Sequence, residues 1–174
     1  MKTVDKLSLA AFELPTFTEG NTSVKNGRED FEREFEIPEG VDYDLGNGLT
    51  ARAVRYGHGV RFRTMEDHGV PEPGWDKRCL VISGGVVYFY FNSLVSKVSF
   101  SYANVANEKY HYMYKEKDAD AVGFFELPVS GGWNTPPKVK SLSSERGIEY
   151  IGILSYEIKP DPVLYIDNLE WEAK

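Results

Sequence analysis

The feature that most constrains this fold is the recurrence of short apolar runs, each followed by Gly, Pro, Asn or Asp. The runs are rich in Val, Ile, Tyr, Phe and Thr, and many alternate apolar with polar residues. Period-two alternation of β-branched and aromatic residues is typical of half-buried β-strands. We therefore expect strands at 7–14, 49–56, 60–65, 78–83, 86–91, 94–103, 109–115, 121–129, 147–158 and 163–171.

The connections between these runs favour antiparallel pairing, because parallel pairing needs crossovers of about a dozen residues or more. Several runs are apolar on both faces, which favours two sheets packed face to face. The glycines Gly57 and Gly59, the pair Gly84–Gly85 and the pair Asn92–Ser93 predict hairpins or reversals. A length of 174 residues suits one domain. The expected fold is a single antiparallel β-sandwich over 1–174.

Alternation also separates inward from outward side chains. Because Phe has no polar atom to place in water, the faces that carry Phe should point inward. In the run 86–91 this leaves Tyr88 and Tyr90 as candidates for a solvent-facing surface. The segment 28–36 fits either a helix or a strand, and the sequence leaves the choice open.

Charge and composition exclude several classes of function. The net charge of −7 argues against general nucleic-acid binding, because phosphate neutralisation needs a basic surface. No stretch reaches the roughly 18 apolar residues of a membrane span, and the N-terminus lacks the apolar core of a signal peptide. The single cysteine, Cys79, excludes an internal disulfide and is expected to be a buried, inert thiol. We expect a soluble domain without membrane insertion, in a compartment that these features leave undetermined.

The C-terminal third carries the most distinctive pattern. It ends in the strand-like motif Tyr165-Ile166-Asp167-Asn168-Leu169-Glu170-Trp171, and the double run VVYFYFNSLVSKVSFSYANV lies upstream. These motifs, with Phe12-Glu13 near the N-terminus, resemble the jelly-roll, galactose-binding-like β-sandwich of many carbohydrate-binding modules and bacterial cell-surface domains. The resemblance implies an antiparallel two-sheet jelly roll. It also implies a non-catalytic carbohydrate-binding or lectin-like domain, outside the cell or on its surface.

Asp167 is the candidate metal ligand. A carboxylate in an apolar strand is costly to desolvate unless it is paired or bound to a metal. In the modules that this chain resembles, this position often helps to bind a structural Ca2+, and Glu13 would be the partner here. The alternative is that Asp167 accepts backbone N–H groups at a bulge or strand end.

Aromatic residues are the main candidates for ligand contact, since sugar rings stack on aromatic planes. Three tyrosines alternate within KYHYMYK and so share one face of a strand. Two tryptophans lie in Gly- and Pro-rich loops, where a large exposed aromatic is harder to explain by packing alone. The candidate residues are Tyr88, Tyr90, Tyr110, Tyr112, Tyr114, Trp75 and Trp133. The other interpretation of each is packing inside the protein.

Arginines form a further candidate group. Arg61 and Arg63 share one face of their expected strand, and Arg52 lies on the preceding run. Across a hairpin they would form a positive stripe suited to an anionic ligand such as a uronic acid. A solvated face balanced by nearby acidic residues is the alternative.

Two other classes of function stay open. A structural or protein-interaction β-sandwich of a phage, toxin or cell-surface assembly would use its aromatics against another chain. Some polysaccharide lyases with a sandwich fold use a Tyr, a His and an Arg to abstract a proton, and Tyr110 or Tyr112, His111 and Arg61 supply these residue types here. Adjacent strand residues point to opposite faces, so His111 cannot act on one surface with either tyrosine. The sequence therefore favours binding over catalysis.

Overall fold

Every regular element in the described part of the computed structural model is a β-strand. The structure describes residues 26–55, 61–66, 78–104, 110–130, 136–155 and 164–174. The strands are β1 (Gly27–Glu29), β2 (Asp42–Gly46), β3 (Leu49–Arg55), β4 (Arg61–Glu66), β5 (Arg78–Ser83), β6 (Gly85–Asn104), β7 (Tyr110–Glu116), β8 (Gly123–Leu127), β9 (Lys138–Ser155) and β10 (Leu164–Ala173). All the strand pairs are antiparallel. The described residues contain no helix long and apolar enough to cross a membrane.

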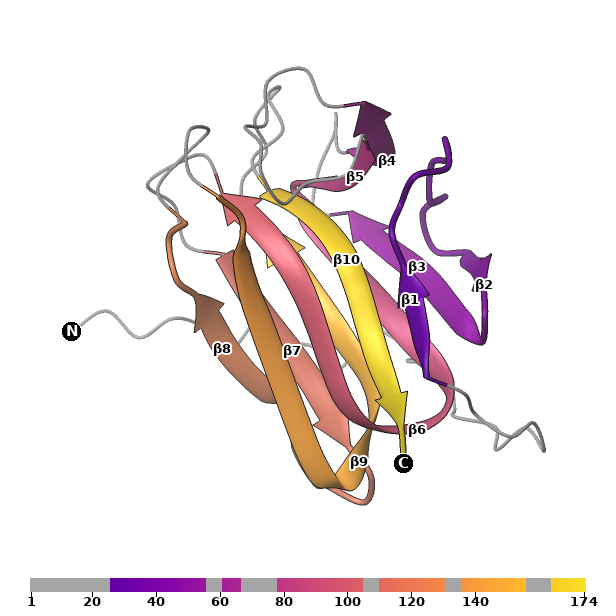
Figure 1. Ribbon diagram of the computed structural model, residues 1–174, viewed down its shortest axis with the longest axis vertical. Helices are drawn as coiled ribbons and strands as arrows, with labels where there is room; N and C mark the ends of the chain where they lie inside the picture. Colours follow the sequence, from indigo (N-terminus) through magenta and orange to yellow (C-terminus); the bar gives the residue numbers. More distant parts are fainter. Residues whose placement is uncertain (1–25, 56–60, 67–77, 105–109, 131–135, 156–163) are drawn as a thin grey trace.

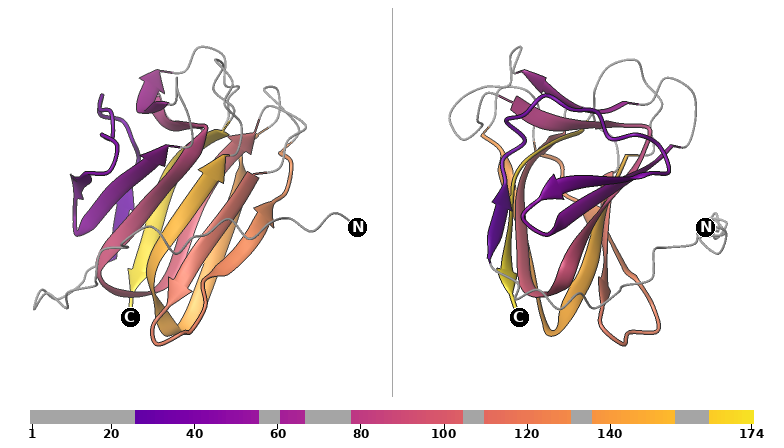
Figure 2. Two further views of the ribbon diagram at one scale, coloured as in Figure 1. Left: turned by 180° about the vertical axis from the view of Figure 1, so that it is seen from behind. Right: turned by 90° about the vertical axis from the view of Figure 1, so that its right-hand side faces the viewer.

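The long strands β6 and β9 run through two packed layers (Figures 1 and 2). The first half of β6 pairs with β3 and with the second half of β9, whereas its second half pairs with β10 and the first half of β9. Register shifts between Tyr90 and Val95 mark the bend. We call the layer with β1, β4, β5 and β10 sheet I, and the layer with β2, β3, β7 and β8 sheet II. The predicted two-sheet jelly-roll β-sandwich is confirmed.

The core lies between the two sheets and follows the predicted alternation. In β6, Phe89 and Phe100 are 0–1 % exposed, and in β9 Ile151 and Ile153 are fully buried. All four belong to one apolar cluster, to which both sheets contribute. The inward direction predicted for the phenylalanine sides is confirmed.

The predicted hairpins are wrong, because neighbours in sequence pair with distant strands. β3 pairs with β2 and β6, whereas β4 pairs with β5, so the runs flanking Gly57 and Gly59 do not form a hairpin. β5 and β6 do not pair with each other either. Gly84, at a φ of 67°, turns the chain between them from sheet I into sheet II.

The reversal predicted at Asn92–Ser93 is also wrong, since β6 continues through it. The Asn92 N–H donates to the Gly48 carbonyl at 2.9 Å, so this part of β6 stays attached to the β2–β3 hairpin. That hairpin turns at Asn47 and Gly48, which both have positive φ. The chain bends here without turning back.

The segment left open at 28–36 is neither a helix nor a full strand. After β1, the buried Glu29 accepts the Phe31 N–H at 2.9 Å and pairs with Arg33 at 3.1 Å. Phe31 has a φ of 56° and is fully buried. Beyond it, the Thr64 N–H donates to the Phe35 carbonyl at 3.0 Å, which ties the segment to β4. A carboxylate-centred loop therefore places both phenylalanines in the core.

Candidate functional site

The outward side of sheet II carries three rows of side chains with an aromatic cluster at their centre. Cross-strand register aligns Asp42, Arg52, Tyr88, Gly152, Met113 and Phe124 in one row. Directly opposed residues lie on the same face of a sheet. The next row holds Asp44, Thr50, Tyr90, Tyr150 and Lys115, and a third holds Val54, Val86, Leu154, His111 and Glu126. We call these three rows the tyrosine face.

Three tyrosines from β6 and β9 form the centre of this face. The ring centroids of Tyr88, Tyr90 and Tyr150 lie 5.4–6.1 Å from one another. Tyr88 is 3 % exposed and Tyr150 is 6 % exposed, whereas Tyr90 is half-buried. The expectation that Tyr88 faces solvent is therefore wrong, because its ring packs in a second apolar cluster with Met113 and Leu154.

The hydroxyl group of Tyr90 distinguishes it within the cluster. Its oxygen is buried and has no hydrogen-bond partner among the described residues. Burial, and then the neighbouring Tyr88, raise the pKa of Tyr90, which the charge of Arg52 partly offsets. Burial, and then Glu149, raise the pKa of Tyr150 to about 12. Both phenols are therefore neutral at ordinary pH.

A glycine makes room for this arrangement. A Cβ atom on Gly152 would lie 2.8 Å from Cγ of Met113 and 3.1 Å from the Tyr88 ring. Real Cβ atoms do not approach other atoms so closely without something shifting. Gly152 thus allows Met113 of β7 and Tyr88 of β6 to pack directly against the backbone of β9.

Polar and aromatic side chains border the cluster. On the β3 side, Nε of Arg52 donates to Oδ1 of Asp42 at 2.7 Å. On the β7–β8 side, the His111 ring stacks on Phe124 at 4.7 Å between centroids, and Phe124 is 46 % exposed. The face thus combines aromatic planes with hydrogen-bonding groups, which is a combination that suits a polar ligand with apolar faces.

The predicted tyrosine row of β7 lies on the other side of the same sheet. Tyr110 and Tyr112 are 1 % and 5 % exposed and belong to the core cluster. Tyr114 is half-buried and stacks on Phe125 at 5.7 Å between centroids. Nζ of Lys140 lies 4.6 Å from the centroid of the Tyr112 ring. Packing therefore occupies Tyr110 and Tyr112, and their predicted ligand contacts are still untested.

The structure separates the lyase-type residues. His111 belongs to the tyrosine face, whereas Tyr110 and Tyr112 point into the core. Arg61 is on β4 of sheet I. His111 and the two tyrosines therefore do not share a surface.

The structure does not describe the side chains of the remaining ligand candidates. Trp75 and Trp133 lie outside the described residues, as do the side chains of Arg61 and Arg63. β4, which carries both arginines, does not pair with β3, which carries Arg52. The hairpin on which the predicted arginine stripe depended is therefore not formed by these two strands.

The buried carboxylate of Asp167 lies at a β-bulge. Its side chain is fully buried, and Oδ1 accepts the Asn168 N–H at 2.7 Å. The register with β6 shifts between Asp167 and Glu170, and Asn168 has a φ of 50°. This is the geometry of the backbone-binding alternative. A carboxylate oxygen also suits Ca2+, but the proposed partner, Glu13, lies outside the described residues, so the calcium site stays a prediction.

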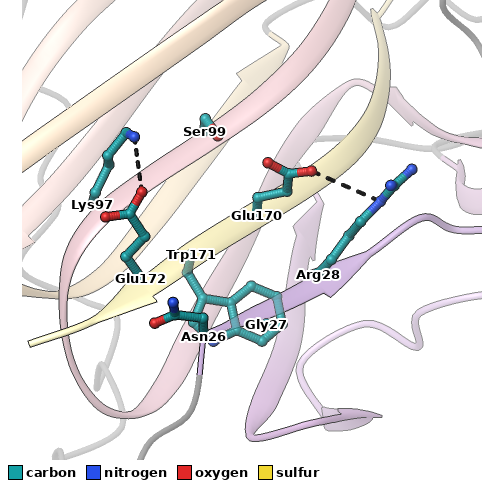
Figure 3. Close-up of a pocket in the computed structure, with 8 residues that line it drawn as sticks. All are labelled: Asn26, Gly27, Arg28, Lys97, Ser99, Glu170, Trp171 and Glu172. Atoms are coloured by element: carbon teal, nitrogen blue, oxygen red, sulfur yellow. Dashed lines mark hydrogen bonds and ion pairs between the residues drawn. The ribbon is translucent and has the colours of Figure 1, made fainter.

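A pocket of about 240 Å³ opens on the outward side of sheet I (Figure 3). Glu170 and Glu172 project into it from β10, and each pairs with a cation on a neighbouring strand. Nε of Arg28 lies 4.0 Å from Oε1 of Glu170, and Nζ of Lys97 lies 2.8 Å from Oε1 of Glu172. The hydrogen bond that Lys97 donates to Glu172 raises the pKa of Lys97, and the negative charge of Glu172 raises it further. The four charges compensate one another, as is usual for surface ion pairs.

The tyrosine face contains residues that the sequence did not identify. Tyr150, Met113 and Asp42 were not among the candidates, and Arg52 was expected to act with Arg61 and Arg63. Because Tyr150 directly precedes Ile151 in β9, alternation along the strand directs it to the opposite face, which is a usable signal. Its proximity to Tyr88 and Tyr90 depends on the pairing of β6 with β9, which local patterns do not reveal.

Solved structures share the fold at low sequence identity, whereas no family model and no curated protein matches the sequence. A cleaved adhesin domain of Lys-gingipain from Porphyromonas gingivalis is 13 % identical, with a TM-score of 0.56, over 86 % of this chain and 99 % of that one. A second cleaved adhesin domain of Lys-gingipain is 14 % identical, with a TM-score of 0.51, over 84 % and 98 %. A family 11 carbohydrate-binding module from Clostridium thermocellum, in complex with a β-1,3-1,4-mixed-linked tetrasaccharide, is 12 % identical, with a TM-score of 0.40, over 87 % and 98 %. At such identities the likeness to the adhesin domains concerns the fold alone.

Proposed function

We propose that this chain is a non-catalytic binding domain that holds a glycan on the tyrosine face. The observation that carries the proposal is the Tyr90 hydroxyl, which is buried within an aromatic cluster and lacks a partner among the described residues. An unpaired buried hydroxyl costs about 1–3 kcal/mol. A ligand that supplies the missing hydrogen bond explains why a tyrosine is present where phenylalanine would pack equally well.

The chemistry of the surrounding side chains supports a sugar as the ligand. Sugar rings present C–H faces to aromatic planes and hydroxyl groups to polar side chains. Phe124 supplies an exposed ring, and the Asp42–Arg52 pair supplies donors and acceptors. Two of the solved structures with this fold are named adhesin domains, which agrees with a binding role.

The substitution Tyr90→Phe tests the proposal. It removes one oxygen atom and should leave the free energy of unfolding unchanged or raise it by about 1 kcal/mol. It should also weaken glycan binding by about tenfold, because one hydrogen bond to the ligand is lost. A glycan array identifies the ligand, calorimetry gives Kd, and urea denaturation gives the stability.

Lys97→Gln, on the outward side of sheet I, is the control and should bind as the wild type does. Trp133→Ala tests the loop prediction separately. Wild-type protein that retains no glycan, or Tyr90→Phe protein that binds with unchanged Kd, would contradict the proposal.

A second candidate function is protein docking at β8. This strand pairs with β7 on one side and ends the strand order of the sheet. Its Phe124 and Phe125 are 46 % and 42 % exposed on opposite faces. Exposed edge strands with apolar side chains are sites where another chain adds a strand. Phe125→Lys should abolish such an association, as measured by sedimentation, while leaving glycan binding intact.

A further inference from the structure

Arg52, a cation at the border of the tyrosine face, is already paired with a carboxylate. Within the described part of this face, Arg52 and Lys115 are the two Lys or Arg side chains. Arg52 donates to Asp42 at 2.7 Å, and Lys115 donates from Nζ to the backbone carbonyl of Ala119. Binding a carboxylate strongly requires a cation whose charge is available to it. Asp42 compensates the charge of Arg52, whereas the carbonyl that binds Lys115 carries no net charge.

The other charges near the tyrosines are negative. Glu126 lies in the row of His111, and Glu149 directly precedes Tyr150 in β9. Asp44 extends the acidic border along β2 next to Thr50. An anionic sugar on this surface would therefore meet like charges in a chain whose net charge is −7. Repulsion of this kind selects against one ligand class as effectively as attraction selects for another.

The same side chains retain hydrogen-bonding capacity of both kinds. A guanidinium group has five N–H donors. Arg52 donates to Asp42 through its Nε–H. The Asp42 side chain is 48 % exposed, so its oxygens are available to hydroxyl donors. The Tyr90 hydroxyl both donates and accepts. Neighbouring sugar hydroxyls, which also donate and accept, match this set.

We infer that the tyrosine face selects uncharged glycans, and that the Asp42–Arg52 pair binds sugar hydroxyls and does not serve as an anion site. The inference rests on the proposed function and assigns its ligand class. It differs from the uronic-acid ligand expected for an arginine stripe, because Arg52 is paired and lies apart from β4.

Affinity electrophoresis of the whole chain against polymers of known charge tests this inference. The probes are the neutral polymers mixed-linkage β-glucan, arabinoxylan and galactomannan, and the uronate polymers polygalacturonate and alginate. We expect retardation by at least one neutral polymer, with Kd lower by about tenfold or more than for either uronate. Because no net charge is recognised, raising the salt concentration should leave neutral binding unchanged.

Variants separate the role of the pair from folding. Arg52→Gln should weaken neutral binding by about tenfold, and Asp42→Asn should do the same while strengthening uronate binding, since it frees the guanidinium. Glu172→Gln, which breaks an ion pair on the outward side of sheet I, is the matched control and should change neither.

The outcomes distinguish this inference from the proposed function. Uronate binding that equals or exceeds neutral binding and is lost in Arg52→Gln would overturn the inference, while the glycan-binding function would stand. Neutral binding that is unaffected by both substitutions would overturn the role of the pair. Failure of the wild type to bind any polymer would contradict the proposed function itself.

Discussion

Tyr150 shows how burial on the tyrosine face changes the acid–base chemistry of single residues. Burial raises its pKa from the ordinary value of 10.0 to about 12, with a further contribution from Glu149. A raised phenol pKa means that the folded state favours the neutral form more than the unfolded state does. The stability that this contributes is complete below about pH 10. It is lost as the pH rises through the folded pKa of about 12.

We therefore predict that a fraction of the phenol groups ionises late in a titration of the folded protein. Absorbance at alkaline pH should show a second step that disappears in urea, where all tyrosines titrate near pH 10. The free energy of unfolding should decline between about pH 10 and pH 12, and Tyr150→Phe should reduce that decline. A single step near pH 10 in folded protein would contradict the burial described here.

Sequence alternation determined the direction of side chains but not their exposure. It placed Tyr88 and Tyr90 outward, and the structure confirms that they share the outward face of β6. It did not reveal that Tyr88 would be 3 % exposed. Exposure depends on which rings arrive from other strands, and Tyr150 and Met113 come from positions that are distant in sequence.

At the scale of elements, Gly152 controls how closely β6, β9 and β7 approach. We predict that Gly152→Ala lowers the free energy of unfolding by about 1–3 kcal/mol, because the added methyl group would overlap Met113 and Tyr88. Adding Met113→Ala should recover part of this loss, since the nearest contact is removed. Urea denaturation of both single variants and the double variant measures the coupling.

The Gly152 prediction fails if the two substitutions have additive effects. Additivity would mean that Met113 is not the atom group that limits space at Gly152. A loss of stability that is recovered only by changing Tyr88 would assign the contact to the aromatic ring instead.

Strand positions could largely be predicted from the sequence, whereas strand partners could not. The expected runs at 78–83 and 163–171 match β5 and most of β10. The first half of β9 was missed because charged and serine residues separate its few buried positions, Leu142 and Ser144. The hairpins at Gly57 and Gly84 were wrong because glycine allows a sharp change of direction without specifying which strand lies alongside.

At the scale of the whole molecule, the reactivity of the single thiol can be used to measure how often the two sheets separate. Cys79 is 3 % exposed and packs with Val81, Ala103 and Tyr165 on the outward side of sheet I. Because β6 and β9 belong to both sheets, we expect the sheets to unfold together. Thiol reagents should therefore label Cys79 slowly in the native state, at a rate that follows global unfolding as denaturant is added.

Labelling kinetics and far-ultraviolet circular dichroism on the same samples check this expectation. The reaction rate and the loss of strand signal should give the same dependence on urea. Fast labelling of fully folded protein would mean that the cluster around Cys79 opens locally, without separation of the two sheets.

The passage of β6 through both layers also bears on how the domain would carry mechanical load. In the proposed complex, a force applied to a glycan at Tyr90 would enter β6, whose second half pairs with β10 in sheet I. The covalent backbone of β6 would transmit this force, and the hydrogen bonds to the strands on either side of β6 would share it. The apolar packing between the two sheets would not have to bear the load. We expect the short outer strands to detach first under load, while the glycan remains bound to β6.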